Sequence, residues 1–179
     1  PRFSPDGRHL AVAGHSAIVG VWGKNGGPPI RLPDHETSPW GGNLAMWASN
    51  ELLVTGLGFG NARQEHVWSV PEGTKLRTID CGKPSFWQVG PGRLFAQTRE
   101  GASVEAFVGG GLLRSWRLPD GEAEVLGRID AGKLGSTSSV FEAHGRAWLY
   151  TKGTTTHLVP LPVNLAADRV FSRHAANVT

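Results

Sequence analysis

The sequence is poor in the residues from which disulfide-bonded proteins and cysteine-based metal proteins are built. Its 179 residues include a single cysteine, Cys81. A lone cysteine has no internal partner for a disulfide and cannot complete a cysteine-based zinc site. A disulfide framework is therefore excluded, no metal is expected, and a reducing, cytoplasmic compartment is the expected location.

Long apolar runs and runs of one charge are also missing. No stretch approaches the roughly 20 apolar residues with which a helix crosses a bilayer, so no membrane span is expected within these residues. The 18 basic and 15 acidic residues are interspersed, and the formal net charge is only +3. Because a nucleic-acid surface needs clustered positive charge, nucleic acid is not an expected partner.

Glycine and proline, by contrast, are abundant, with 25 and 12 residues spread along the whole chain. Dispersed turn formers indicate many short elements joined by tight turns. No apolar stripe of 3.6-residue period and useful length is present, so helices are not expected. The composition favours an all-β protein.

A repeat of about 48 residues underlies the sequence. WSVPEG, which begins at Trp68, returns as WRLPDG at Trp116, 48 residues later. Val21-Trp22 precedes Trp68 by 46 residues, and Ile79-Asp80 returns as Ile129-Asp130 after 50 residues. A self-similar period of this length is typical of propellers and other repeat architectures.

Each repeat contains four short apolar stretches separated by turn residues. Four strands in a unit of 44 to 50 residues is typical of a β-propeller blade, a small antiparallel sheet that buries its faces only by stacking on its neighbours. The expected blades span about residues 1–38, 39–83, 84–133 and 134–175, and residues 176–179 are interpreted as the start of a further repeat. The predicted fold is about four blades of an incomplete propeller.

The first repeat resembles a blade of the WD-repeat (WD40) family. Phe3-Ser4-Pro5-Asp6-Gly7 matches the turn that opens such blades, and Val21-Trp22 matches the strand that closes them. The other repeats are degenerate copies, and together they cover nearly the whole chain. The resemblance implies a propeller of commonly seven blades, so the remaining blades are expected elsewhere in a longer parent protein.

The sequence departs from the family pattern in two respects. The residue after each tryptophan is Gly23, Ser69 or Arg117, never the aspartate that gives the family its name. The resemblance also implies a hydrogen-bonded set of His, Ser, Asp and Trp side chains in each blade, and no repeat carries the complete set. His35 and His174 occupy the loop position of its histidine and are expected to be structural. We therefore expect the blades to depend mainly on apolar stacking.

No constellation of catalytic residues is apparent. Enzymatic propellers converge acids, histidines or asparagines on the channel, whereas the expected inner strands here offer Asn43, Gln88 and Glu142 at unlike depths. The sequence has no Gly-x-Ser-x-Gly nucleophile elbow and no phosphate-binding loop. The chain is therefore predicted not to be an enzyme and to hold no cofactor.

Binding residues are expected among exposed aromatic and arginine side chains and in long loops. The segments 57–63 and 99–110 are longer than a tight hairpin, and Trp40 lies in a connecting segment beside glycines. Trp47 and Trp87 are further aromatic candidates, although a strand position such as that of Trp87 also suits the core. The candidate partner-binding residues are Trp40, Phe59, Arg63 and Arg99, whereas the inter-blade core is predicted to hold Trp22, Trp68 and Trp116.

These features predict a non-catalytic scaffold or sensor module that binds a protein partner. The 13 arginines against 5 lysines are typical of a GC-rich genome, and the resemblance implies a bacterial signalling protein that carries a kinase or an ATPase switch. The alternative is an accessory propeller of a hydrolase, a peptidase or a TolB-like protein. The repeats of such proteins share the Pro-x-Phe-Ser-Pro-Asp-Gly start found at residues 1–7.

Overall fold

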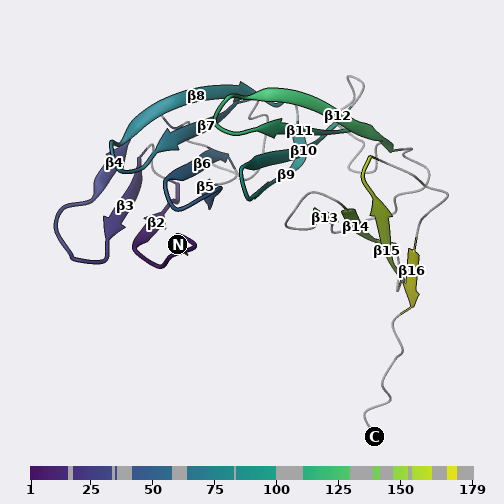
Figure 1. Ribbon diagram of the computed structural model, residues 1–179, viewed down its shortest axis with the longest axis horizontal. Helices are drawn as coiled ribbons and strands as arrows, with labels where there is room; N and C mark the ends of the chain where they lie inside the picture. The colour runs from purple at the N-terminus through teal and green to yellow at the C-terminus, as the bar shows by residue number, and fades with distance from the viewer. Residues whose placement is uncertain are drawn as a thin grey trace, which may run out of the picture.

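The regular structure of the described residues is entirely β-strand. The computed structural model describes residues 1–15, 18–33, 35, 42–57, 64–82, 84–99, 111–129, 139–141, 147–152, 155–162 and 169–172. Their strands form four sheets that follow one another along an arc (Figure 1). This arrangement confirms the predicted all-β fold of propeller blades.

Each sheet contains four antiparallel strands in chain order, and we call the sheets blades 1 to 4. Blade 1 comprises β1 (Arg2–Phe3), β2 (His9–Val12), β3 (Val19–Gly23) and β4 (Ile30–Leu32). Blade 2 comprises β5 (Asn43–Trp47), β6 (Leu52–Leu57), β7 (Gln64–Ser69) and β8 (Thr74–Asp80). Blade 3 comprises β9 (Pro84–Gly90), β10 (Arg93–Arg99), β11 (Gly111–Arg117) and β12 (Glu122–Ile129). Blade 4 comprises β13 (Ser139–Phe141), β14 (Ala147–Lys152), β15 (Thr155–Pro160) and β16 (Arg169–Ser172).

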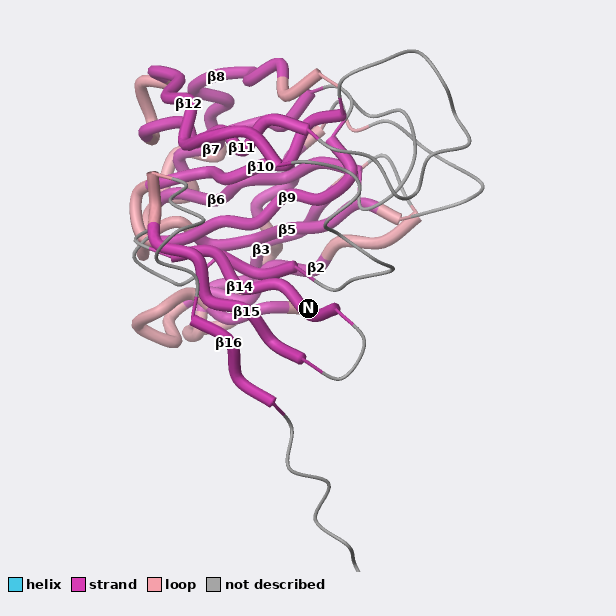
Figure 2. The backbone as a smooth tube through the Cα atoms, turned by 90° about the vertical axis from the view of Figure 1, so that its right-hand side faces the viewer, coloured by secondary structure: helices cyan, strands magenta, loops and turns pink. Residues whose placement is uncertain are grey.

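In blades 2 and 3 the inner strands face the inner side of the arc and the outer strands its outer side (Figure 1). Seen from the side, β8 and β12 lie at the upper margin, with β9 and β5 below them (Figure 2). The repeated hairpins between the two outermost strands turn at Gly73 and Gly121, whose φ angles are 63° and 71°. Glycine adopts this left-handed conformation without strain, which explains why Pro-Glu-Gly and Pro-Asp-Gly recur at the same place in the repeat.

Two apolar seams hold blades 1, 2 and 3 together. Adjacent strand residues point to opposite faces of a sheet, so Leu53 packs toward blade 1 while Val54 packs toward blade 3. The seam between blades 1 and 2 contains Ala11, Val19, Val21, Leu32, Ala45, Leu53, Trp68 and Val70. The seam between blades 2 and 3 contains Ala48, Val54, Val67, Ile79, Cys81, Leu94, Ala96, Trp116 and Leu118. Apolar stacking is thus the main contact between these blades, as predicted.

The repeated tryptophans do not all share the environment that the sequence predicts. Trp68 and Trp116 are 2% and 4% exposed, and each packs against the preceding blade. Trp22 holds the same position in blade 1, yet its side chain is 38% exposed and its ring lies across Gly20. The prediction that Trp22 belongs to the inter-blade core is wrong for the described chain, because no described blade covers this face of blade 1.

Within the described ranges, no helix has the length and apolar character needed to span a membrane.

Because the repeated tryptophans are buried to different extents, their replacement by alanine should lower the free energy of unfolding by different amounts. Trp68→Ala and Trp116→Ala should each lower the free energy of unfolding by about 3–5 kcal/mol, because they open a cavity in a seam. Trp22→Ala should cost clearly less, because its ring already contacts solvent. Urea unfolding of the three variants measures the difference, and equal losses would contradict the exposed position of Trp22.

Candidate functional site

A groove opens where the first strands of three blades end. β1, β5 and β9 neighbour one another along the inner side of the arc (Figure 1). Each of them runs into the turn that leads to the second strand of its blade. The groove at these strand ends has a volume of about 580 Å³, and its walls are Arg2, Phe3, Pro5, Met46, Trp47, Gln88 and Val89.

Hydrogen bonds between neighbouring blades hold the walls of the groove in place. The indole Nε1–H of Trp47 donates to the backbone oxygen of Arg2 at 3.0 Å, which ties blade 2 to blade 1. The backbone N–H of Gly92 donates to the oxygen of Ala48 at 3.0 Å, which ties blade 3 to blade 2. The groove therefore has a fixed shape set by the scaffold.

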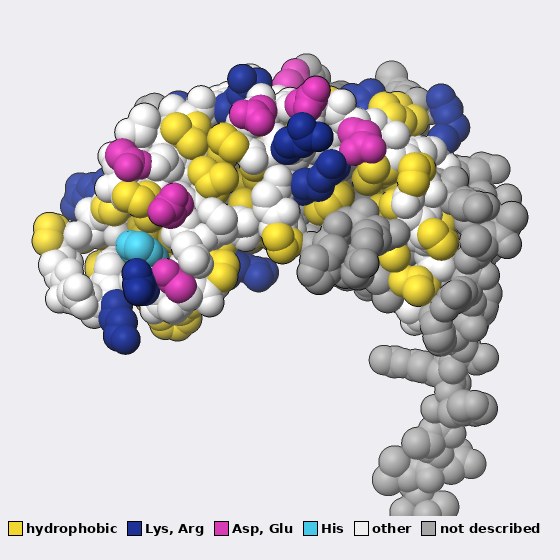
Figure 3. Space-filling view, in the orientation of Figure 1, with side chains coloured by type: hydrophobic (Ala, Val, Ile, Leu, Met, Phe, Trp, Pro, Cys, Tyr) yellow, Lys and Arg dark blue, Asp and Glu magenta, His cyan; other side chains and the backbone are white. Residues whose placement is uncertain are grey.

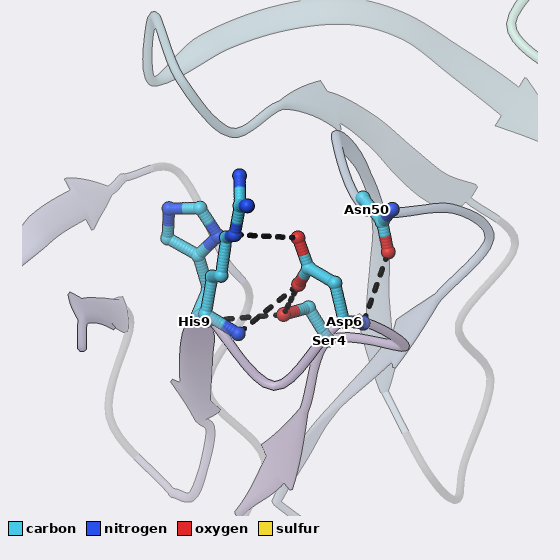
Figure 4. Close-up of polar contacts among 5 residues, drawn as sticks. Ser4, Asp6, His9 and Asn50 are labelled. Carbon is cyan, nitrogen blue, oxygen red and sulfur yellow. Dashed lines mark hydrogen bonds and ion pairs between the residues drawn. The ribbon is translucent and has the colours of Figure 1, made fainter.

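The Ser-Pro-Asp-Gly turn of blade 1 forms a small polar network beside the groove (Figure 4). The Ser4 hydroxyl donates to Asp6 Oδ1 at 2.7 Å, the Arg8 backbone N–H donates to the same oxygen at 3.0 Å, and the His9 backbone N–H donates to Ser4 Oγ at 3.0 Å. The hydrogen bond from Ser4, followed by that from Arg8, lowers the pKa of Asp6. The Asp6 backbone N–H donates to Asn50 Oδ1 of blade 2 at 3.1 Å, so this turn is also tied to its neighbour.

The groove is apolar and aromatic, with one cationic group. Trp47 is half-buried. Phe3 is 68% exposed, and its register partner Leu10 pairs in turn with Trp22, so Phe3 lies on the face of blade 1 that no described blade covers. Arg2 is the charged residue of the lining, and Gln88 contributes an amide. No acid, nucleophile or metal-binding set lines the groove, and the described residues contain no group of three or more metal-ligating side chains. The described lining suits binding.

A second, smaller cavity of about 310 Å³ lies near the outer strands of blade 3. Its charges are already paired, because Arg93 contacts Glu124 at 2.8 Å and Arg117 contacts Glu122 at 3.1 Å. Along the convex margin, basic and acidic side chains are mixed on the face that Figure 3 shows. The charges that line this cavity are therefore matched within the described chain.

Of the four partner-binding residues that the sequence predicts, only Arg99 belongs to the described residues. Trp40, Phe59 and Arg63 lie outside the described residues. Arg99 ends β10, where its backbone pairs with Gly111, and its side chain lies outside the description. The end of β10 is opposite to the strand end at which the groove opens, so the groove is a separate candidate site.

Of the groove residues, Trp47 is an aromatic candidate from the sequence, whereas Arg2 and Phe3 are not among the predicted binding residues. Both belong to the family-like opening motif, and this motif favoured a purely structural interpretation. One feature of the sequence could have indicated the groove. Large apolar residues recur at the ends of the inner strands, at Phe3, Met46-Trp47 and Val89. Of the polar inner-strand residues, Gln88 lines the groove, Asn43 is buried with its backbone N–H on the Gly14 oxygen, and Glu142 lies outside the described chain.

A buried polar triad joins blades 1 and 2. His35 Nε2 and Thr55 Oγ1 are hydrogen-bonded at 2.6 Å, and Trp68 Nε1–H donates to the same hydroxyl oxygen at 2.8 Å. The His35 ring also stacks on Trp68, with 5.6 Å between the centroids. The structural role predicted for His35 is confirmed. Although the aspartate of the family set is missing from this triad, three side chains still form a connected network.

The corresponding positions of the next seam are apolar. Cys81 follows Trp68 by the same number of residues that separates His35 from Trp22, and Ala96 holds the strand position of Thr55. Cys81 and Ala96 both pack with Trp116 in the seam between blades 2 and 3. Burial, with smaller contributions from Glu65 and Asp80, raises the pKa of the Cys81 thiol, so this cysteine is not an activated nucleophile.

Glu65 is a buried acid in the same seam. It lies three residues before the repeated tryptophan, where blades 1 and 3 carry Val19 and Leu113. Its side chain is 0% exposed, and burial raises the pKa of its carboxyl well above the usual range. Within the described chain, neither carboxyl oxygen has a hydrogen-bond partner, and the buried Nε of Arg114 also has none. Gly56 on the neighbouring strand makes room for the carboxyl group, because a Cβ there would overlap it.

The fold and the groove define the class of this chain, which is a set of β-propeller blades with an open apolar groove. No family model matches the sequence. The chain is similar to a chain in the structure titled "Crystal Structure of Mitotic Checkpoint Complex", at 17% sequence identity and a TM-score of 0.52. The similarity covers 84% of this chain but only 44% of the other, so the sequence spans less than half the length of the chain it matches. The similarity shows the fold.

The buried Glu65 carboxyl predicts an inverse dependence of stability on pH. Its folded-state pKa lies above the ordinary value of 4.5, so its contribution is greatest below that pH and is lost as the pH rises toward the folded-state pKa. The stability of the wild type relative to Glu65→Gln should fall with rising pH, by at most about 1.4 kcal/mol per pH unit. Urea unfolding between about pH 5 and 8 measures it, with exposed Glu51→Gln as the control. A wild type that gains stability relative to Glu65→Gln as the pH rises would contradict the prediction.

Because a Cβ at Gly56 would overlap the Glu65 carboxyl, substitutions at these two positions should have non-additive effects on the free energy of unfolding. Gly56→Ala should destabilise the wild type by about 1–3 kcal/mol through overpacking. The same change should cost much less in a Glu65→Val background, because valine already occupies this position in blade 1. Gly23→Ala, where a Cβ meets no atom within 4 Å, is the matched control. A double-mutant cycle without an interaction energy would refute the predicted overlap.

Proposed function

We propose that this chain is a non-catalytic protein-interaction module that binds its partner in the groove on the inner strands. The observation that carries the proposal is an apolar and aromatic lining, which includes Met46, Trp47 and Val89, on walls tied together by inter-blade hydrogen bonds. Large apolar and aromatic groups that are held rigidly at a concave surface are the usual anchors of protein interfaces. The likeness to propeller blades supports the proposal, because such folds present binding surfaces on a rigid scaffold.

The described groups with raised pKa values do not favour an enzymatic alternative. Glu65 and Cys81 are buried in the seam between blades 2 and 3, where a substrate has no access, and neither lines the groove. A reaction site needs a titratable group within reach of a bound substrate. The groove offers a guanidinium group and an amide, which bind and orient but do not exchange protons near neutral pH.

The proposal extends to the context of the module. A longer, cytoplasmic, WD-repeat-like signalling protein would supply a further blade to cover Trp22 and a kinase or ATPase switch in the same chain. The exposed ring of Trp22, the buried free cysteine and the excess of arginine support this context. An accessory propeller of a hydrolase is the second candidate, supported by the motif at residues 1–7. A nucleotide-binding motif in the flanking reading frame would favour the first, and a nucleophile elbow the second.

Site-specific photocrosslinking tests the interaction function. A photoreactive phenylalanine analogue at Phe3 or Trp47 should form an adduct with one and the same protein in the native host. The analogue at Leu76 or Val125, which are exposed on the outer strands, should not form this adduct. With the purified partner, Phe3→Ser should weaken binding about 30-fold, as expected for an interface anchor worth about 2 kcal/mol. If the analogue forms the same adduct at Leu76 or Val125 as at Phe3 or Trp47, the groove is not the binding site.

A further inference from the structure

The strands whose ends form the groove are also the edge strands of their sheets. β1, β5 and β9 are the first strands of their sheets, and each pairs on one side only within its sheet. An edge strand presents backbone N–H and C=O groups on its free side, which another extended chain can pair with. Peptide recognition by strand addition uses such groups for affinity and uses nearby pockets for selectivity. The backbone around the groove therefore favours an extended peptide as its occupant.

Among the described residues, the lining of the groove carries one positive charge, that of Arg2. Arg2 is exposed and forms no ion pair within the described ranges, and no acidic residue is part of the lining. The nearest acid in sequence, Asp6, already accepts hydrogen bonds from Ser4 and Arg8 and contacts the Arg8 guanidinium at 3.6 Å (Figure 4). The Arg2 guanidinium thus remains available to a carboxylate from another chain, its best-matched partner.

The apolar walls next to Arg2 favour a peptide that also has a large apolar side chain. The indole N–H of Trp47 is bound to the backbone oxygen of Arg2, so Trp47 is fixed beside the backbone of the arginine. Met46 and Val89 extend the apolar lining on the neighbouring strands, and Phe3 lines the groove from the other face of β1. A large apolar side chain can therefore be buried next to a carboxylate that reaches the arginine.

We propose that the groove binds an extended peptide in which Asp or Glu stands beside a large apolar residue. This inference rests on the proposed function and names the chemistry of its partner. The volume of about 580 Å³ lies within the range of about 300–1,000 Å³ that is usual for ligand pockets. A nucleic-acid strand is a poorer match, because phosphate backbones are bound by several cations and the groove carries one.

Selection from a random seven-residue peptide library with the full chain tests this ligand class. The wild type should enrich peptides with Asp or Glu next to Phe, Trp, Leu or Met. Arg2→Glu should lose this preference and enrich Lys or Arg at the same position, because the charge of the groove is inverted. Arg31→Glu is the matched control, since Arg31 is an exposed arginine on the outer strand β4 and should keep the acidic preference.

Fluorescence anisotropy with one enriched peptide gives the magnitude. Arg2→Gln, and Asn or Gln in place of the peptide acid, should each weaken binding about tenfold, and the two changes together should cost little more. Rising salt should weaken the wild-type complex more than the Arg2→Gln complex. Thermal melting checks that the Arg2 variants fold, as expected for an exposed side chain.

Three results would overturn the inference: no enriched peptide, enrichment without a charge preference, or the same preference in the wild type and Arg2→Glu. The crosslinking result separates these failures from failure of the proposed function. If Phe3 and Trp47 crosslink to one partner while the acidic preference is absent, the interaction module stands and the ligand class is wrong. If the crosslinks are also absent, the proposed function fails as well.

Discussion

Face-to-face packing of one four-stranded sheet on the next is the interaction on which the rest of this structure depends. A sheet of short strands has two faces to bury and too little area to be stable alone. Strand alternation divides the apolar residues of blade 2 between its two neighbours, with Leu53 in one seam and Val54 in the other. Each fully buried large side chain contributes about 1.5–3 kcal/mol. Every other feature, including the groove, is held in place by these seams.

The two described seams differ in the hydrogen bonding of the polar side chains that they bury. Between blades 1 and 2, the Thr55 hydroxyl is hydrogen-bonded to both His35 Nε2 and the Trp68 indole. Between blades 2 and 3, the equivalent positions are apolar, yet Glu65 is buried three residues before the tryptophan. A buried polar group is costly unless it is hydrogen-bonded, so these seams differ in their response to pH although their apolar contacts are alike.

The groove follows from the way in which the seams bring the inner strands together. Once the blades are stacked, the ends of β1, β5 and β9 meet, and bonds such as that from Trp47 to the Arg2 backbone set their spacing. A rigid surface loses little conformational entropy when it binds, which makes exposed aromatic groups on it effective anchors. The packing that stabilises the fold therefore also prepares the binding surface, and the chemistry of the surface depends on the few side chains at the strand ends.

Local sequence predicted the elements of this protein well because the signals for them are local. Glycine turns, alternating apolar residues and the repeated tryptophan indicated four-stranded blades, and the structural role of His35 followed from its place in the repeat. The groove could not be predicted in the same way. Its residues come from three repeats more than 40 residues apart, and each of them, taken alone, is an ordinary strand residue.

The sequence by itself determined the blades, their strands and turns, and the apolar faces by which they stack. The tertiary structure decided which faces are covered, and this is why Trp68 is buried while Trp22, at the same repeat position, is 38% exposed. It also decided that Glu65 is buried beside Gly56, and that Arg2, Phe3 and Trp47 line one groove. The physical reason is that burial and proximity are properties of pairs of sheets, whereas a repeat in the sequence describes one sheet at a time.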